Sequence, residues 1–257
     1  MRFAVLGSGS KGNCTLVEAG STRLLIDNGF SGKELISRLH SLDIAPESLT
    51  AILVTHEHDD HVKGVGVVAR RLNLPVYANE ATHRAAEQRM GKVPGRLDFG
   101  TGESFAIEEL RVHPFSVSHD TSDPVGFVVS DGICNLGYCT DTGKITRLMH
   151  HHLLQCQAVV LEANHDVQML KEGPYPLPLQ QRVLSSRGHL ANTDSLTFAA
   201  QLSEERLRLL VLAHLSEINN HPDLVLREAQ RRLPGRGTLR VLLAGQGQAS
   251  PLLEIGP

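Results

Sequence analysis

The sequence predicts an α/β protein folded as a four-layer αββα sandwich, in which two sheets pack face to face and helices cover their outer sides. Short apolar runs of strand type recur along the 257 residues, and stretches with apolar residues at helical spacing lie between them. Strands and helices are combined in both halves, and two such similar halves suggest sheets packed together with helices on both outer faces. Because the one linker-like stretch, Gly173–Pro178, is too short to separate domains, we expect a single domain over residues 1–257. No repeat of solenoid length is present.

The first third of the chain alternates β-rich runs with helical segments. Gly/Ser turns separate the strands that we expect at Arg2–Leu6, Thr15–Ala19, Thr22–Asp27, Ala51–Thr55 and Pro75–Ala78. Apolar residues at helical spacing predict helices over Gly32–Leu42 and over 65–72. Asn79 is suited to cap a further helix that extends to about Arg89.

The middle of the chain is β-rich, and the second half returns to alternating helices and strands. Strands are expected at Ser104–Glu108, Leu110–Val117, Val125–Ser130, Ile133–Tyr138, Ala158–Glu162, Leu209–Ala213 and Leu239–Ala244. Helices are expected at Ile145–Leu154, Leu196–Leu202 and Leu224–Arg232, and the second of them is capped near Asn192 or Thr193. The proline-rich segment Gly173–Pro178 is too short to separate domains, and we expect a rigid loop near the site.

Composition and charge exclude several classes of protein. A formal net charge of -3 excludes a broadly basic surface for nucleic acid, although it is compatible with a local basic groove. The absence of Trp and an aromatic content of 4% argue against base-stacking platforms of the single-strand-binding type. No apolar run approaches the ~18 residues of a membrane span, and the N-terminus lacks the apolar core of a signal peptide. The cysteines form no C-x-x-C pair, which favours reduced thiols in a cytoplasmic protein: Cys14, Cys134, Cys139 and Cys156.

The densest group of potential metal ligands is the run His56-Glu57-His58-Asp59-Asp60-His61, directly after the buried strand at Ala51–Thr55. Imidazole and carboxylate groups suit Zn²⁺, Mn²⁺ or Fe²⁺. On a loop that leaves a strand, the alternate residues His56 and His58 can face one ion, and Asp60 and His61 can turn towards a second. An acidic, histidine-rich surface loop is the alternative interpretation, but such dense clustering after an apolar strand favours a metal site.

Three further ligand-type residues each follow a predicted strand: His119, Asp141 and His214. Strand ends at one edge of a sheet are where α/β proteins place their sites. By contrast, His150, His151 and His152 lie on a predicted amphipathic helix and are interpreted as a solvated face. Cys139, near Asp141 in sequence, is interpreted as a core residue.

The arrangement His-x-His-x-Asp-His, followed by a later His, a later Asp and a late His, resembles the metallo-β-lactamase superfamily. The resemblance covers nearly the whole chain and is most specific to the bacterial YycJ branch, also called WalJ or VicX, which is similar to ribonuclease Z, ribonuclease J and the phosphonate-pathway cyclic phosphodiesterase. The segments that carry it are Leu6–Asn13, Ile26-Asp27, Gly29–Lys33, Leu161–Asp166, Gly188–Asn192 and Ala213–Asn220.

The resemblance implies a hydrolase with two divalent metal ions, Zn²⁺ or Mn²⁺, that acts as a 5′-to-3′ exonuclease on single-stranded DNA. It assigns one metal to His56, His58 and His119 and the other to Asp60, His61 and His214, with Asp141 bridging. It further implies that Asp60, His189 and Glu162 take part in catalysis. His189 is the candidate general acid, and Glu162 is the residue that orients it. In the alternative interpretation, His189 only stabilises the loop that carries it. The chain has no room for the large inserted domain of ribonuclease J.

Candidate substrate contacts are Ser10, Asn13, His165 and Asn192. Ser10 and Asn13 belong to a glycine-rich turn, together with Ser8 and Lys11, that can meet phosphate, although a tight hairpin explains the turn equally well. For His165, a phosphate contact and an ordinary histidine at a helix start are balanced interpretations.

Other functions remain open at this stage. The same fold could cleave RNA, a small cyclic phosphodiester, an ester or a lactone, because a fold does not determine a substrate. A redox protein of the di-iron type is disfavoured because a Glu is expected there in place of His58. A regulatory metal-binding protein without turnover is the fourth hypothesis.

Overall fold

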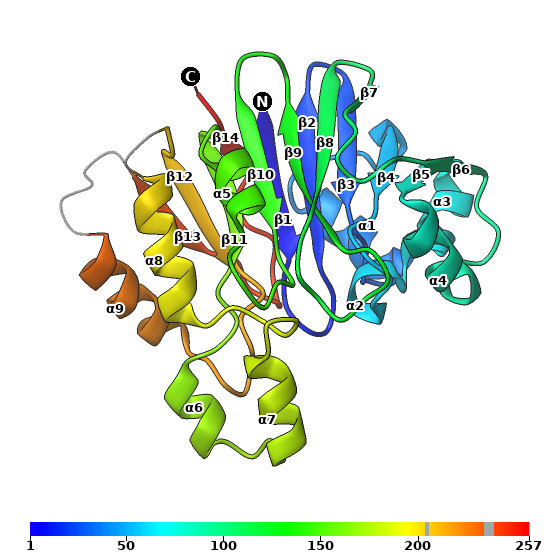
Figure 1. Ribbon diagram of the computed structural model, residues 1–257. Helices are drawn as coiled ribbons and strands as arrows, with labels where there is room; N and C mark the ends of the chain where they lie inside the picture. Colours follow the sequence, from blue (N-terminus) through cyan, green and yellow to red (C-terminus); the bar gives the residue numbers. More distant parts are fainter. Residues whose placement is uncertain (204–205, 234–238, 257) are drawn as a thin grey trace.

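The computed structural model describes residues 1–203, 206–233 and 239–256, and it confirms the predicted four-layer αββα arrangement (Figure 1). Within these residues, two seven-stranded sheets pack against each other. Helices lie on the outer side of each sheet. No helix in the described part of the chain is long and apolar enough to cross a membrane.

The first sheet is formed by the N-terminal half together with one strand from the C-terminal end. Its order is β14 (Leu253–Glu254), β1 (Arg2–Gly7), β2 (Cys14–Ala19), β3 (Thr22–Ile26), β4 (Ala51–Leu53), β5 (Pro75–Ala78) and β6 (Gly95–Asp98). The strands from β14 to β3 pair antiparallel, and those from β3 to β6 pair parallel. The outer face of this sheet is covered by α1 (Gly32–His40), α3 (Val65–Leu72) and α4 (Glu80–Met90).

The second sheet has the same mixed construction. Its order is β13 (Arg240–Leu243), β12 (Leu209–Ala213), β11 (Ala158–Glu162), β10 (Asn135–Cys139), β9 (Val125–Ser130), β8 (Leu110–Ser116) and β7 (Phe105–Ile107). The strands from β7 to β10 pair antiparallel, and those from β10 to β13 pair parallel. The outer face is covered by α5 (Arg147–Leu153), α8 (Asn192–Leu202) and α9 (Pro222–Arg232).

The alternation of side chains along each strand explains why three separate cores form. In β11, Ala158 and Val160 point into the core between the sheets, whereas Val159 and Leu161 point towards the helices. In β4, Ile52 faces the helical side and its two neighbours face the other sheet. Strands buried on both faces read as continuous apolar runs, which is why the sequence predicted them well.

Two short helices project from one end of the sandwich, between β11 and α8 (Figure 1). They are α6 (Val167–Glu172) and α7 (Leu177–Leu184). The predicted loop at Gly173–Pro178 is therefore partly wrong, because α7 begins at Leu177 with Pro178 in its first turn, where the missing proline N–H costs nothing. The expected cap at Asn192 or Thr193 is also wrong: the N-cap of α8 is Ala191, and no side chain caps this helix.

The elements that sequence analysis missed are short or solvated. Besides α6 and α7, they are the 3₁₀ turn η1 (Pro46–Ser48), α2 (Asp59–Val62), β6 and β14. Three of the four residues of β6 are exposed, so this strand lacks the apolar signal of its neighbours. All four cysteines are buried and free, and Cys139 packs in the core between the second sheet and its helices.

Candidate metal centre

The loop after β4 turns into α2 and carries the histidine- and aspartate-rich run. His58 is the N-cap of α2, and Asp60 and His61 lie within this short helix. His56 and His61 are almost completely buried, although the run is polar. Buried imidazoles need polar partners, so the neighbours of this loop determine what it can do.

Three strand ends of the second sheet bring ligand-type side chains to the same loop. His119 follows β8, Asp141 follows β10 and His214 follows β12. The last two adopt left-handed backbone conformations, with φ of 56° for both. Such a conformation is rare for residues other than Gly, and its occurrence here is typical of strained functional positions.

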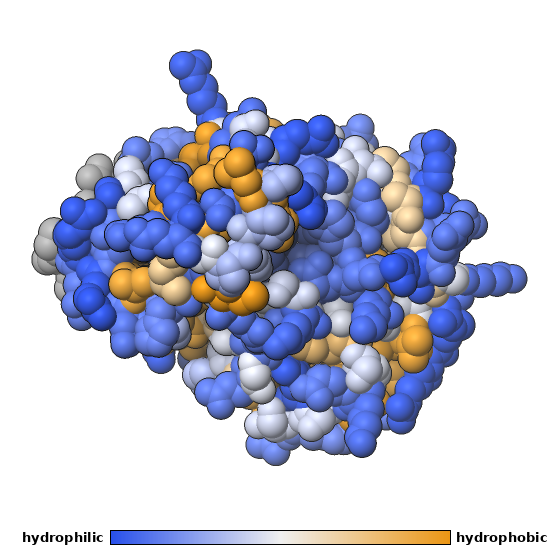
Figure 2. Space-filling model, turned by 90° about the horizontal axis from the view of Figure 1, so that it is seen from below, coloured by the Kyte–Doolittle hydropathy of each residue, from blue (hydrophilic) through white to orange (hydrophobic). Residues whose placement is uncertain are grey.

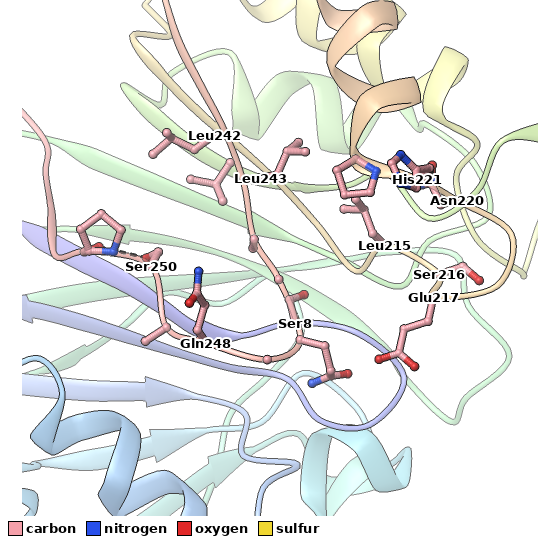
Figure 3. Close-up of a pocket in the computed structure, with 18 residues that line it drawn as sticks. Ser8, Leu215, Ser216, Glu217, Asn220, His221, Leu242, Leu243, Gln248 and Ser250 are labelled. Carbon is pink, nitrogen blue, oxygen red and sulfur yellow. Dashed lines mark hydrogen bonds between the residues drawn. The ribbon is translucent and has the colours of Figure 1, made fainter.

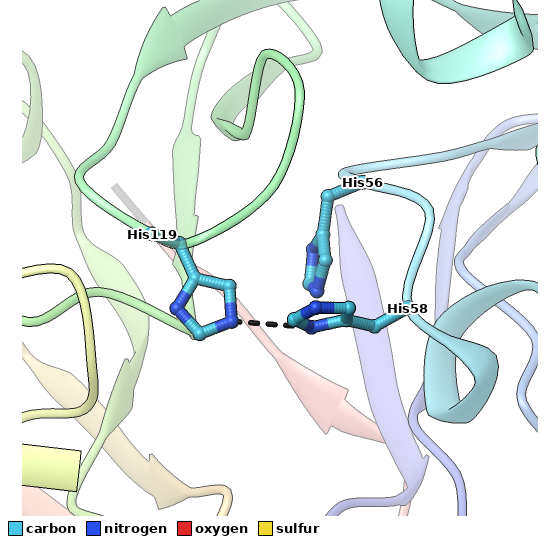
Figure 4. A group of neighbouring side chains, drawn as sticks. All are labelled: His56, His58 and His119. Atoms are coloured by element: carbon cyan, nitrogen blue, oxygen red, sulfur yellow. Dashed lines mark hydrogen bonds between the residues drawn. The ribbon is translucent and has the colours of Figure 1, made fainter. Parts of the chain in front are cut away.

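The first group comprises His56, His58 and His119, whose ligand atoms lie within 4.8 Å of one another. Figure 4 shows the rings of the first two coming from one loop and that of His119 approaching from the opposite side. Nε2 of His119 lies 3.2 Å from Nδ1 of His58.

The second group comprises Asp60, His61 and His214, again with ligand atoms within 4.8 Å of one another. Asp141 lies between the two groups. Its Oδ2 is 3.2 Å from Nε2 of His61, its Oδ1 is 3.5 Å from Nε2 of His214, and the same Oδ1 is 3.9 Å from Nε2 of His119. The seven residues that the sequence singled out therefore meet in one cluster.

Two buried atoms in this cluster make no hydrogen bond of acceptable geometry with any described residue, although one of them lies 3.2 Å from Nε2 of His61. They are Nε2 of His56 and Oδ2 of Asp141. An unpaired buried polar atom costs about 1–3 kcal/mol, so its persistence calls for another partner. A divalent cation would supply one, and a donor set of imidazole nitrogens and carboxylate oxygens suits Zn²⁺ and Mn²⁺. The side chains present therefore fit divalent metal binding.

The pKa shifts of two members of the cluster, His56 and Asp141, favour the protonation states that bind a cation. Burial lowers the pKa of His56 well below its usual value, and the neighbouring His61 adds to this effect, so its imidazole is neutral and can bind a cation. Burial raises the pKa of Asp141, but the positive charges of His214 and His61 outweigh burial and hold that pKa well below its usual range. The carboxylate is therefore ionised.

An outer shell of hydrogen bonds fixes the orientation of the ligands. Oδ2 of Asp27 lies 2.8 Å from Nδ1 of His61 and accepts a hydrogen bond of 2.8 Å from the hydroxyl of Thr55. That hydroxyl lies 2.9 Å from Nδ1 of His56. Carboxylate–histidine contacts of this kind set the tautomer and direction of a metal ligand. Sequence analysis assigned no role to Asp27 or Thr55, although a polar residue at the end of the buried strand β3 was an available signal.

Glu162, at the end of β11, is completely buried and contacts two histidines. Its Oε1 lies 2.7 Å from Nδ1 of His189 and 3.1 Å from Nδ1 of His214, and its Oε2 accepts hydrogen bonds from the backbone N–H groups of Thr142 and Leu190. Burial raises the pKa of Glu162, but the charge and hydrogen bond of His189 and the hydrogen bond of His214 outweigh this effect and lower it to about 2. The ionised Glu162 therefore accepts Nδ1–H from both rings.

The four predicted substrate contacts differ in their exposure to the cleft. Ser10 is exposed and lines the cleft above the cluster. Asn13 is fully buried beneath it and does not line the cleft; its Nδ2 lies 3.0 Å from Oδ2 of Asp60 and 3.0 Å from Nε2 of His61. Asn192 is likewise buried and does not line the cleft, and its amide pairs with that of Asn220. His165 is 1% exposed, and burial lowers its pKa to about 4.

The cleft consists of two adjoining cavities of about 220 and 450 Å³. Both are lined by Ser10, Arg182, His189 and His214. Figure 2 shows the end of the molecule that carries α6 and α7; hydrophilic residues predominate there, and the surface is hollowed near the centre of the view.

A larger cavity of about 620 Å³ lies beside the metal centre (Figure 3). Its walls include the apolar side chains of Leu215, Leu242 and Leu243, and none of the seven predicted ligands lines it. It meets the centre at Ser8, whose hydroxyl accepts a hydrogen bond of 2.8 Å from the backbone N–H of His214. Size alone therefore does not identify the chemical site.

Comparison with known proteins places these observations in a family. The profile of the Beta-lactamase superfamily domain matches residues 22–214. The chain is 37% identical to exodeoxyribonuclease YycJ of Bacillus anthracis, over 100% of this chain and 96% of that protein. It is 36% identical to exodeoxyribonuclease WalJ of Streptococcus pneumoniae, over 99% of this chain and 98% of that one. The metallo-beta-lactamase fold protein YhfI of Bacillus subtilis shares the fold, with a TM-score of 0.74 and 17% identity over 97% of this chain and 98% of that one.

Proposed function

The chain belongs to the β-lactamase superfamily, and on this premise we propose that it is a two-metal-dependent phosphodiesterase that degrades single-stranded DNA from the 5′ end, as a cytoplasmic enzyme. One observation carries the proposal: the two ligand groups meet around Asp141 at one edge of the sandwich. The full-length similarity to two proteins named exodeoxyribonucleases supports the choice of substrate.

In this proposal, His56, His58 and His119 hold one divalent cation, Asp60, His61 and His214 hold the other, and Asp141 contributes to both. When bound, two such cations lower the pKa of a nucleophilic water and neutralise charge on the phosphoryl oxygens. Asp60 and His214 of the second group line the cleft, so the cation that they would hold is accessible to the reacting phosphate.

The residues of the chain supply the proton for the leaving group. His189 lines the cleft, and its Nδ1–H is engaged by Glu162, so Nε2 is the atom that carries a transferable proton. We assign this Nε2–H to the oxygen that leaves phosphorus. Glu162 keeps the ring in that orientation and offsets the positive charge of the imidazolium.

A substrate panel with metal analysis tests the proposal. We expect cleavage of 5′-labelled single-stranded DNA with Mn²⁺ or Zn²⁺, with release of the label before internal fragments, and about two metal ions per chain. Single-stranded RNA, a cyclic phosphodiester and a lactone are the comparison substrates. Turnover of the lactone without turnover of any phosphodiester would overturn the phosphodiesterase proposal, and faster turnover of RNA than of DNA would overturn the assignment of DNA.

A further inference from the structure

The two cavities of the cleft have different walls. The 450 Å³ cavity is lined by acidic side chains, including Glu57, Asp59 and Asp60. The 220 Å³ cavity is bounded on one side by His119, His189 and His214 and on the other by residues of the α7 segment: Tyr175, Leu179, Arg182 and Val183. Arg182 lines both cavities, and it is the only Lys or Arg among the described residues that line either of them.

Arg182 is oriented by the residue that follows a predicted metal ligand. Its Nε donates a hydrogen bond of 2.6 Å to Oδ2 of Asp120. The other oxygen of Asp120 is buried and lies 3.4 Å from Nε2 of His119 and 3.8 Å from Nε2 of His58, and no described residue forms a hydrogen bond with it. Asp120 therefore joins the first ligand group to α7.

The guanidinium of Arg182 retains binding capacity. Its Nε bonds Asp120, whereas neither Nη group donates to any residue in the described part of the chain. The side chain is 56% exposed, so these two groups can reach a ligand in the cleft. A guanidinium fork with free N–H donors suits phosphate oxygens, which it can bind in pairs.

The segment that carries Arg182 is fixed to the ligand loops. The carbonyl oxygen of Val183 accepts a hydrogen bond of 3.0 Å from the backbone N–H of His189. The hydroxyl of Ser118 donates to the carbonyl oxygen of Ser186 at 2.8 Å, and Nε of Arg187 donates to the carbonyl oxygen of His119 at 3.1 Å. Because the C-terminal end of α7 and the loop that follows it are tied to the ligand loops, Arg182 is preorganised with respect to the metal centre.

We infer that α7 is the substrate-binding wall of this cleft: Arg182 binds a backbone phosphate of the DNA strand, and Tyr175 packs against the adjacent nucleoside. This inference rests on the proposed function. A polyanion that enters a cleft rich in carboxylates needs a compensating cation apart from the metals, and Arg182 is the one that the described lining offers. Tyr175 is half-buried in the cavity wall, and an aromatic ring there provides a stacking surface for a base. The 220 Å³ cavity is smaller than the ~300–1,000 Å³ pockets that enclose drug-sized ligands, so it accommodates part of a strand.

Binding measurements separate the two contacts. A single-stranded oligonucleotide labelled at its 3′ end, with phosphorothioate linkages that keep the charge but resist cleavage, is titrated with the metal-loaded full chain over a series of salt concentrations. Arg182→Gln keeps a donor near Asp120 but removes the charge. We expect it to weaken binding by roughly 10- to 100-fold and to reduce the slope of log Kd against log salt by about 0.7, the contribution of one phosphate contact on a single strand. Tyr175→Ala should weaken binding by roughly 5- to 100-fold without a change in slope.

Matched controls come from the same segment. Lys171→Ala removes an exposed positive charge from α6, and Leu177→Ala removes a side chain of α7 that is 65% exposed, and neither residue lines the cleft. Both should bind DNA like the wild type. With Mn²⁺ present, Arg182→Gln should raise KM more than it lowers kcat, and Arg182→Lys should restore the salt slope.

The outcomes distinguish the two proposals. If the wild type neither binds nor cleaves DNA, the proposed function fails and the inference with it. If the wild type binds and cleaves while Arg182→Gln keeps the wild-type affinity and salt slope, only the inference is overturned. An equal loss in Lys171→Ala would also overturn it, because the effect would then be one of overall charge. Melting temperatures identify a variant that has lost its fold, and Arg182→Lys then provides the comparison.

Discussion

Oε1 of Glu162 lies 2.7 Å from Nδ1 of His189, and the same oxygen lies 3.1 Å from Nδ1 of His214. One buried carboxylate thus orients both the candidate general acid and a candidate metal ligand. The backbone N–H groups of Thr142 and Leu190 donate hydrogen bonds to its second oxygen. Both oxygens therefore act as acceptors, and a donor group could replace neither of them.

Glu162→Gln should therefore impair metal binding and catalysis together. An amide has only one acceptor oxygen. Its NH₂ group would therefore face either the two histidine rings or the two backbone N–H groups, all of which are donors. Loss of such a partner typically costs 10- to 100-fold in metal affinity or activity. Competition titration for Zn²⁺ and initial rates on DNA measure the two effects. Wild-type values of both would show that the carboxylate does not orient these rings.

His189→Ala should slow the cleavage of DNA far more than that of an activated ester. A general acid contributes typically 10²- to 10⁴-fold when the leaving group is a poor one. A nitrophenolate needs no proton, so bis-p-nitrophenyl phosphate should lose little. The kcat values on both substrates make the comparison, and equal losses would remove the general-acid role from His189.

Removal of metal should abolish activity and lower stability. EDTA should stop cleavage, and Mn²⁺ should restore it. A cation at 100 times its Kd stabilises the folded state by about 2.7 kcal/mol, which should raise the Tm of the wild type. In His61→Ala this rise should shrink, whereas His40→Ala, at an exposed position of α1, should behave like the wild type. A full metal-dependent rise in His61→Ala would contradict the assigned ligand set.

Gly29→Ala should disturb the ligand loop through its backbone. A Cβ at this position would lie 1.9 Å from the carbonyl oxygen of Asp60, so the loop must move. Overpacking of this kind costs roughly 1–3 kcal/mol, and each kcal/mol lowers Tm by about 2–4 °C in a chain of this size. Gly245→Ala is the control, because nothing lies within 4 Å of its added Cβ. Calorimetry should show a lower Tm for the first variant alone.

Much of the candidate centre could be predicted because its ligands directly follow strands, and these strands are recognisable in the sequence as apolar runs. The run from His56 to His61 is contiguous, and His119, Asp141 and His214 each follow a run of strand type. The parallel strands β11 and β12 bring Glu162 and His214 to the same edge, as the order of elements suggests.

The other wall of the cleft could not be predicted for physical reasons. α6 and α7 have only 6 and 8 residues, and prolines precede and begin α7, so helical spacing is too short to recognise. The roles of Asp120 and Arg182 depend on a contact between residues 62 positions apart. The contact of Asn13 with Asp60 joins residues 47 positions apart, so a glycine-rich turn near a strand end did not indicate it.

The ligands belong to both sheets: His56 to His61 follow β4 of the first, and His119, Asp141 and His214 follow strands of the second. A cation bound among them is therefore a cross-link between the two halves of the chain. Its loss should let the halves separate locally at this edge, so amide hydrogen exchange near the ends of β4 and β12 should accelerate together, while the opposite end of the sandwich keeps its protection.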